Sequence, residues 1–184
     1  AAALAPWIAP HDPIAQDLGN RLLPPGTPGH WLGTDDFGRD ILSRILHGAR
    51  ITLQIVALVA LTAPVLGLLV GTVAGYFGGW VDQVLMRVTD IFLAFPRLIL
   101  ALALVAVLGP GVGNAVLAIA LTAWPPYARV ARAETLTVRG SDYIAAVRLQ
   151  GAGAPRIIWG HVVPMCVPSV IIRVTLDMAG VSLI

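Results

Sequence analysis

The sequence contains no lysine, and all twelve of its basic residues are arginines. The absence of lysine excludes a Walker A phosphate-binding loop, a Schiff-base lysine and a lysine general base on this chain. Cysteine is almost absent too, since Cys166 is alone, so neither an internal disulfide nor a cluster of thiolate metal ligands can form. A net charge of +2 is too small to indicate binding to nucleic acid.

Charged residues are scarce and unevenly distributed. They make up 12% of the chain, against about 25% in soluble domains, whereas hydrophobic residues make up 57%. Residues 51–81 and 98–128 contain no charged residue at all. Because about 20 apolar residues cross a bilayer core, both stretches predict membrane-spanning helices. One helix over 98–128 would be ~46 Å long, well beyond the ~30 Å core, so a turn between two spans is expected there.

This pattern predicts an all-α, polytopic transmembrane helix bundle in which residues 51–184 form the membrane domain. Three complete spans and one partial span are expected, at 51–76, 91–108, 115–130 and from about Val162 onward. A polar connection over 78–90 and a glycine-rich turn at 109–114 would join them. The chain is expected to lack at least one helix at each end, because residues 1–8 and 162–184 both read as parts of apolar segments.

Glycine recurs at every fourth position of the first span, at Gly67, Gly71 and Gly75. This spacing lines one face of a helix with glycine and permits a neighbouring helix to approach closely. We interpret the three residues as a helix-packing seam. The alternative is the general small-residue usage of a chain rich in glycine and alanine.

Residues 1–50 form a different region, interpreted as an external loop followed by an amphipathic surface helix. Prolines recur between Pro6 and Pro28, which predicts loop rather than helix or central strand. A helix is expected to begin at Thr34 or Asp35. The apolar face of that helix would consist of Phe37, Ile41, Leu42, Ile45 and Leu46. Such a pattern is typical of a helix on the membrane surface, and also of a packed helix that binds nothing.

Three of the four histidines fall in or beside this loop, at His11, His30 and His47. Their spacings of 19 and 17 residues match no short metal-ligand motif. Ordinary loop histidines are the simpler interpretation, so no metal site is expected.

A polar island over residues 129–163 follows the last complete span. It carries five arginines against Glu134 and Asp142, whereas residues 1–50 hold four arginines against five aspartates. By the positive-inside rule, the island is expected in the cytoplasm and residues 1–50 on the outer side.

The centre of this island reads as a helix, a turn and a second helix. Four residues share one face of the first helix: Ile144, Val147, Arg148 and Gly151. Gly151 permits a backbone conformation that side chains disfavour, and Pro155 suits the first turn of a new helix. A small amphipathic unit of this kind is suited to insertion into a cleft on another protein.

The same stretch contains a spaced set of residues: Ala145, Ala146, Val147, Gly151, His161, Val163 and Pro164. This pattern resembles the EAA loop of bacterial ABC importer permeases. Ala145 stands at the family's glutamate position, Val147 at its second alanine position and His161 at its isoleucine position. The missing glutamate removes one polar contact expected with the ATPase, and Asp142 is a candidate to replace it.

Two further stretches are similar to the C-type permease subunit of dipeptide, oligopeptide and nickel importers. They are residues 4–50, which include His30-Trp31-Leu32-Gly33-Thr34-Asp35, and residues 90–96, Asp-Ile-Phe-Leu-Ala-Phe-Pro. The resemblance implies a type I permease fold in the bacterial inner membrane. The residues that it implies for ATPase coupling lie in 142–164: Asp142, Ala145, Ala146, Val147, Arg148, Gly151, His161 and Pro164.

The resemblance also implies partners. ATP-binding subunits would carry ATP and Mg, a second permease subunit would complete the pathway, and an extracytoplasmic binding protein would deliver a peptide or related small solute. The permease itself would be neither an enzyme nor a cofactor protein. The sequence agrees, because it holds no G-x-S-x-G or H-E-x-x-H motif.

Two interpretations stay open at this stage. Arg173 and Asp177 lie four residues apart in the last apolar segment, where they could line a pathway or form a structural pair. An ion-gradient-driven secondary transporter or a membrane scaffold are the alternative functions. Acidic residues buried within spans would favour the transporter, yet 51–81 and 98–128 contain none.

Overall fold

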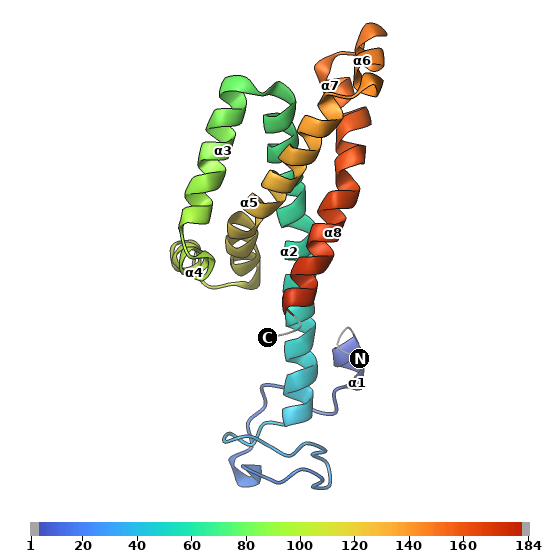
Figure 1. The fold of residues 1–184 in the computed structure, drawn as a ribbon. Helices are drawn as coiled ribbons and strands as arrows, with labels where there is room; N and C mark the ends of the chain where they lie inside the picture. The colour runs from blue at the N-terminus through green and yellow to red at the C-terminus, as the bar shows by residue number, and fades with distance from the viewer. Residues whose placement is uncertain (1–3, 182–184) are drawn as a thin grey trace. The chain divides into compact units, whose positions relative to one another are not determined.

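The computed structural model describes residues 4–181, with side chains as far as Met178 (Figure 1). The chain divides into two compact units, residues 1–57 and 58–184, and each is described by itself. Within the described residues the secondary structure is helical, with two isolated β-bridges in place of strands, which confirms the all-α class. The elements are α1 (Ala5–Ile8), η2 (Leu18–Asn20), α2 (Ile41–Phe77), α3 (Gly79–Ala94), α4 (Arg97–Leu108), α5 (Val112–Arg139), α6 (Asp142–Leu149), α7 (Ala154–Ile157), η3 (Ile158–Val162) and α8 (Val163–Val181).

The first unit is a loop held together by polar side chains. The Thr34 hydroxyl accepts a hydrogen bond from Leu23 N at 2.9 Å and donates one to the Asn20 carbonyl at 2.5 Å. The Asp35 carboxylate accepts from the backbone amides of Phe37 and Arg39 at 2.9 and 3.0 Å, and from Arg39 Nε at 2.8 Å. Desolvation would raise the pKa of Asp35, but these hydrogen bonds outweigh it and lower the pKa from 3.8 to about 2.

The helix expected to begin at Thr34 or Asp35 begins instead at Ile41, and it continues without a break to Phe77. The reason is local, because Gly38 adopts a left-handed φ of +72° and Asp35 N donates to the Arg39 carbonyl at 3.1 Å, a loop contact that a helix over these residues excludes. Asp40 supplies the cap, since its Oδ2 accepts from Ser43 N at 2.8 Å.

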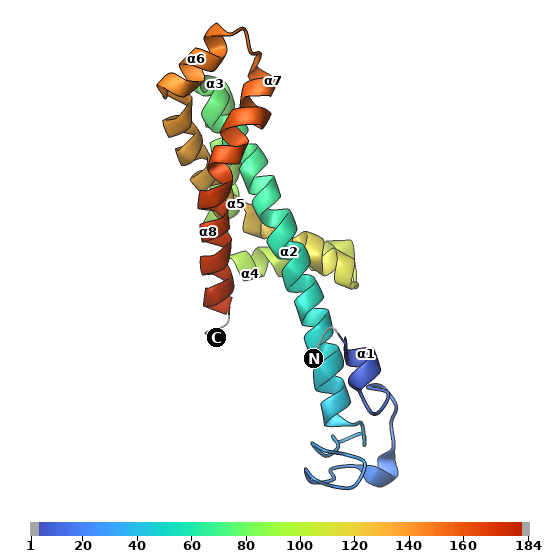
Figure 2. The same cartoon turned by 90° about the vertical axis from the view of Figure 1, so that its right-hand side faces the viewer.

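The second unit is built around α5. Helices α3, α4 and α8 each pack against it, and the glycines of α2 face it as well. One buried cluster joins α2, α5 and α8 through four alanines, a tyrosine and a valine: Ala63, Ala120, Ala123, Tyr127, Ala131 and Val170. Figure 2 shows the same helices after a quarter turn.

Pro96 changes the path expected for residues 78–108. The polar connection predicted over 78–90 is helix α3, and the single span predicted over 91–108 is broken between α3 and α4, whose axes differ by 95°. Phe95 is extended at φ −90° and ψ 141°, as the residue before a proline prefers, and this conformation ends α3.

Two described helical stretches are long and apolar enough to cross a membrane, 41–77 and 154–178, and the bent pair α3–α4 would be a third if it counts as one span. The span predicted at 115–130 is the first part of α5, which continues to Arg139 and falls outside this set. The turn predicted at 109–114 is shorter, because α5 already begins at Val112.

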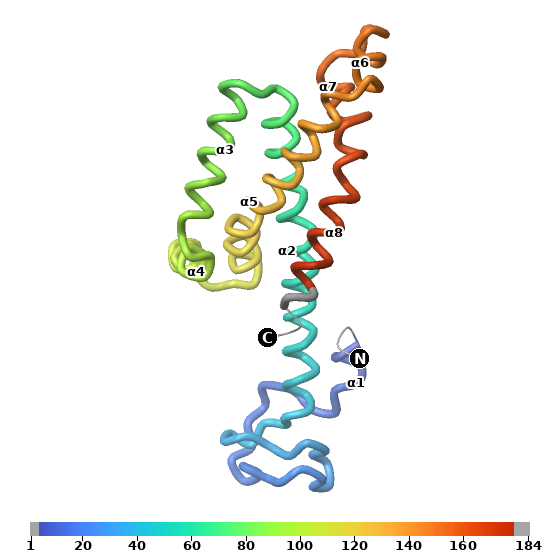
Figure 3. Tube along the Cα trace, viewed as in Figure 1, coloured from blue at the N-terminus to red at the C-terminus, as the bar shows by residue number. Residues whose placement is uncertain are grey.

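The tube in Figure 3 shows that the α2–α3 junction and the segment from α6 to η3 lie at one end of the second unit, while the α4–α5 turn lies away from that end. Side-chain contacts agree with this arrangement. Arg139 Nη1 donates to the Gly75 carbonyl at 3.3 Å, and the Arg148 guanidinium lies 5.5 Å from the centre of the Tyr76 ring.

Candidate functional site

The candidate site is the segment 142–164, which we call the polar hairpin. It comprises α6, a four-residue turn, α7, η3 and the start of α8. Ser141 begins α6, because its hydroxyl accepts from Ile144 N at 3.4 Å and donates to the Val138 carbonyl at 2.7 Å. Asp142 in the first turn and Arg148 in the last turn complement the helix dipole.

Gly151 ends α6 in a left-handed turn. Its φ is +82°, its amide donates to the Arg148 carbonyl at 2.9 Å, and Ala152 N donates to the Val147 carbonyl at 3.4 Å. These two bonds form a Schellman motif with glycine at C′. A Cβ at Gly151 would meet nothing within 4 Å, so the glycine serves the backbone conformation rather than close packing.

One face of the polar hairpin is buried in the second unit. Ile144 and Val162 have no exposed surface and Ile157 has 1%. They belong to a cluster that includes Tyr76 at the end of α2, as well as Val138, Val147, Ile158 and Cys166. The hairpin is therefore anchored to α2, α5 and α8 by apolar contacts.

The opposite face is open to solvent. Leu149 is 90% exposed and Tyr143 is 51% exposed. Most of the residues predicted to contact an ATPase are exposed as well: Asp142, Ala145, Ala146, Arg148, Gly151 and Pro164. Val147 is buried instead and His161 is half-buried, so these two support the hairpin from inside.

Tyr143 and His161 connect the two arms of the polar hairpin. The Tyr143 hydroxyl and His161 Nδ1 are 2.6 Å apart, and the rings meet edge to face with centroids 5.5 Å apart. Sequence reasoning missed the role of Tyr143, because nothing in its local pattern indicates a partner eighteen residues further on. His161 lies in η3, a single π-helical turn that leads into α8.

The three predicted seam glycines face α5. A Cβ at Gly67 would come within 3.0 Å of Trp124 O and Ala128 N, and one at Gly75 would come within 3.0 Å of Thr135 and Arg132. Gly71 is equally close to Ala131. Helices α2 and α5 therefore approach at a distance that leaves no room for side chains along this line.

Two ion pairs connect α3 to α5, and sequence reasoning missed both. Arg132 binds Asp82 with two bonds of 2.5 Å, from Nε and Nη2, whereas Arg129 Nη2 binds Asp90 with one bond of 2.6 Å. The first pair is the more enclosed, with side chains 33% and 16% exposed against 57% and 51% for the second.

We expect Asp82→Asn to lower the free energy of unfolding by about 1–2 kcal/mol, because it leaves a partly buried guanidinium with its charge uncompensated. Asp90→Asn, the matched control on the same helix, should cost less than about 1 kcal/mol, because that pair is exposed. Thermal unfolding in detergent measures both variants. Equal losses would show that the bidentate pair does not hold α3 on α5.

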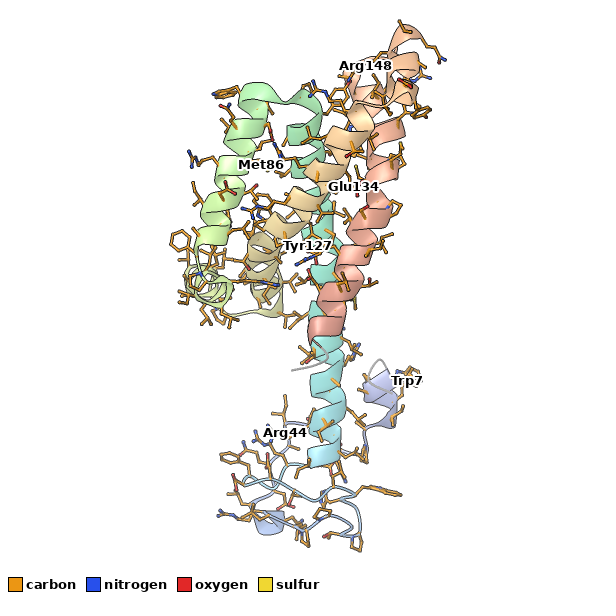
Figure 4. All side chains as sticks on the ribbon, in the orientation of Figure 1. Trp7, Arg44, Met86, Tyr127, Glu134 and Arg148 are labelled. Atoms are coloured by element: carbon orange, nitrogen blue, oxygen red, sulfur yellow. The ribbon has the colours of Figure 1, made fainter. Side chains whose placement is uncertain are left out.

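Arg173 and Asp177 form the pair considered above, with Nη2 and Oδ1 3.2 Å apart. The Tyr127 hydroxyl donates to the other Asp177 oxygen at 2.8 Å, and this contact joins α5 to α8. Ser169 of α8 likewise donates to Glu134 of α5 at 2.7 Å. Figure 4 labels Tyr127 and Glu134 on α5 and Arg148 on the polar hairpin.

The described fold is that of a helical membrane permease: apolar helices around α5 and a polar helical hairpin at one end. The family described as "Binding-protein-dependent transport system inner membrane component" matches residues 67–183. The chain belongs to this family.

Curated relatives cover nearly the whole chain. It is 43% identical over 182 residues to the nickel transport system permease protein NikC of Escherichia coli (strain K12), covering 99% of the chain and 65% of that protein. It is 39% identical over 185 residues to the dipeptide transport system permease protein DppC of Haemophilus influenzae, covering 98% and 63%. The probable D,D-dipeptide transport system permease protein DdpC of Escherichia coli is 41% identical over 179 residues, covering 97% and 60%. The resemblance to C-type permeases of peptide and nickel importers is thereby confirmed.

Proposed function

We propose that this chain forms part of the translocation pathway of an ATP-driven importer, and that the polar hairpin couples it to ATP-binding subunits. The observation that carries the proposal is the two-faced hairpin. Its inner face is fixed by Ile144, Ile157 and Val162, whereas its outer face presents Leu149 and Arg148 to solvent. An exposed apolar side chain beside a cation, at the tip of a rigid unit, suits a cleft on a soluble partner.

The hairpin is also connected in a way that can transmit movement. Helix α5 leads into it and α8 leads out of it, and α5 and α8 pack on each other. A nucleotide shifts the equilibrium between two conformations of such an assembly only if it binds those conformations with different affinities. Closure of an ATPase pair around the hairpin would supply that difference and would move α5 and α8 together.

The proposed assembly follows the family. Two ATP-binding subunits would hold ATP and Mg, a second permease subunit would complete the path through the bilayer, and an extracytoplasmic binding protein would deliver the cargo. The cargo would be a peptide or a related small solute, in line with the nickel, dipeptide and D,D-dipeptide transport named for the relatives. In the bacterial inner membrane, the arginines of residues 129–163 favour the cytoplasmic side for the polar hairpin and the outer side for residues 1–50.

Crosslinking tests this proposal directly. Cys166 is the sole cysteine and is buried, so a Cys166→Ala background provides a clean start. Leu149→Cys in this background should crosslink to an ATP-binding subunit in the assembled complex. It should also react with a membrane-impermeant maleimide only from the cytoplasmic side.

The matched control is Val107→Cys, a residue of α4 that is 85% exposed. It should give no crosslink to the ATP-binding subunit. The proposal fails if position 149 is labelled from the outer side, or if both positions crosslink equally.

A further inference from the structure

His11, His30 and Asp40 come together within the first unit although they are far apart in the sequence. One ligand atom from each residue lies within 4.8 Å of those from the other two. The imidazole rings of His11 and His30 have centroids 4.8 Å apart, and His30 Nδ1 lies 3.1 Å from Asp40 Oδ1. Spacing along the sequence does not indicate this grouping, because two of the residues meet across a loop and the third precedes α2.

The His11 and Asp40 side chains are each positioned by a contact through one polar atom, and the other polar atom faces the cluster. His11 Nε2 donates to the Gly29 carbonyl at 2.8 Å, so the neutral ring keeps its lone pair on Nδ1. Asp40 Oδ2 accepts from Ser43 N at 2.8 Å, so Oδ1, which here accepts from His30 Nδ1, is the oxygen that can turn to an ion. The Ser43 hydroxyl in turn accepts from His11 N at 3.1 Å and fixes that segment beside α2.

We propose that His11, His30 and Asp40 form a binding site for one divalent first-row transition-metal ion. Two imidazoles and one carboxylate are a ligand set suited to Zn²⁺, Ni²⁺, Co²⁺ or Cu²⁺, whereas Mg²⁺ and Ca²⁺ prefer oxygen ligands alone. The hydrogen bond from His11 to a backbone carbonyl is the type of contact that orients metal-ligating histidines.

The distances fit an ion after a small adjustment. Ligands about 2.1 Å from a tetrahedral ion are separated by about 3.4 Å. The 3.1 Å between His30 Nδ1 and Asp40 Oδ1 is close to that value, and the proton between them would leave on binding. The widest separation of 4.8 Å requires a movement of about 1.4 Å, which the exposed His11 ring can make while the 1%-exposed Asp40 side chain stays fixed.

Cobalt titration of the assembled permease complex in detergent tests the site, because Co²⁺ absorption in the visible range reports its ligands and geometry. The complex should bind one Co²⁺ per copy of this chain, and Zn²⁺ should displace it. His11→Ala, His30→Ala and Asp40→Asn should each weaken binding by about 10-fold or more. Asparagine keeps the helix cap at position 40, so this variant separates loss of the ligand from loss of the fold.

His47→Ala is the matched control. His47 lies on α2 near the cluster in sequence, but its Nδ1 bonds the Ser43 carbonyl at 3.0 Å within its own helix. The His47→Ala variant should bind Co²⁺ as tightly as the unchanged chain. In the presence of a chelator, all variants should melt at similar temperatures. The proposal is overturned if the unchanged chain takes up no Co²⁺ at this stoichiometry. It is also overturned if the ligand variants retain full affinity or if His47→Ala loses as much. The result is independent of ATPase coupling, which involves the other unit.

Discussion

Gly71→Ala is expected to destabilise the second unit by about 3 kcal/mol, the upper end of the usual range for overpacking. A Cβ there would lie 2.7 Å from Ala131 Cβ and 2.9 Å from Arg132 N, and closer still to the carbonyl oxygen of Ala128. Two of these three atoms belong to the α5 backbone, which cannot rotate aside as a side chain can. The helices must therefore separate along the seam, and α5 loses contact with α2 over several turns.

The measurement is the thermal transition of the purified chain in detergent, together with the amount recovered from membranes. Gly48→Ala is the matched control, since Gly48 lies in the same helix and a Cβ there would meet nothing within 4 Å. Because alanine is the better helix former, by about 1 kcal/mol, that variant should be neutral or slightly stabilised. A variant in which Gly67, Gly71 and Gly75 are all replaced by alanine should leave little folded chain. If Gly71→Ala had the same melting temperature as the unchanged chain, the close approach of α2 and α5 would be refuted.

These glycines also show what a sequence can predict. Their four-residue spacing indicates a packing face without any knowledge of the partner, because helix geometry alone places them in line. The pattern could not identify α5 as the helix opposite, since that depends on how the other helices pack. The turn at Gly151 could likewise be predicted from the sequence. A glycine at the end of an amphipathic stretch, followed by Pro155, is a local signal for the end of one helix and the start of the next.

The predictions that failed depend on competition between neighbouring residues. Apolar composition favoured one span over 91–108, but Pro96 and the extended Phe95 break the helix and turn its direction by 95°. Apolar periodicity favoured a helix from Thr34 or Asp35, but Gly38 is left-handed and Asp35 N bonds the Arg39 carbonyl across a turn, so the helix begins only at Ile41. Contacts between distant segments, such as Tyr143 with His161, leave no periodic trace and could be found only in the structure.

Gly151→Arg is expected to abolish transport-coupled ATPase activity while the chain remains in the membrane. The left-handed φ of +82° costs a side-chain-bearing residue about 1–2 kcal/mol, too little to unfold the unit. Nothing lies within 4 Å of a Cβ at this position, so the arginine would project from the exposed face of the polar hairpin. A bulky cation there would meet the cleft that we propose on the ATP-binding subunit and prevent docking.

Three comparisons separate docking from backbone strain. Asparagine tolerates the left-handed conformation, so Gly151→Asn should retain coupling. Gly151→Ala carries the backbone strain without the bulk of arginine, so it should retain most of the coupling. Gly109→Arg repeats the charge and a similar φ of +84° at the α4–α5 turn, again with nothing within 4 Å, and should leave ATPase stimulation unchanged. Uptake and vanadate-sensitive ATP hydrolysis in proteoliposomes measure all four variants. Because only the arginine at 151 combines bulk, charge and a place on the polar hairpin, normal coupled uptake in that variant would refute the hairpin as the point of ATPase contact.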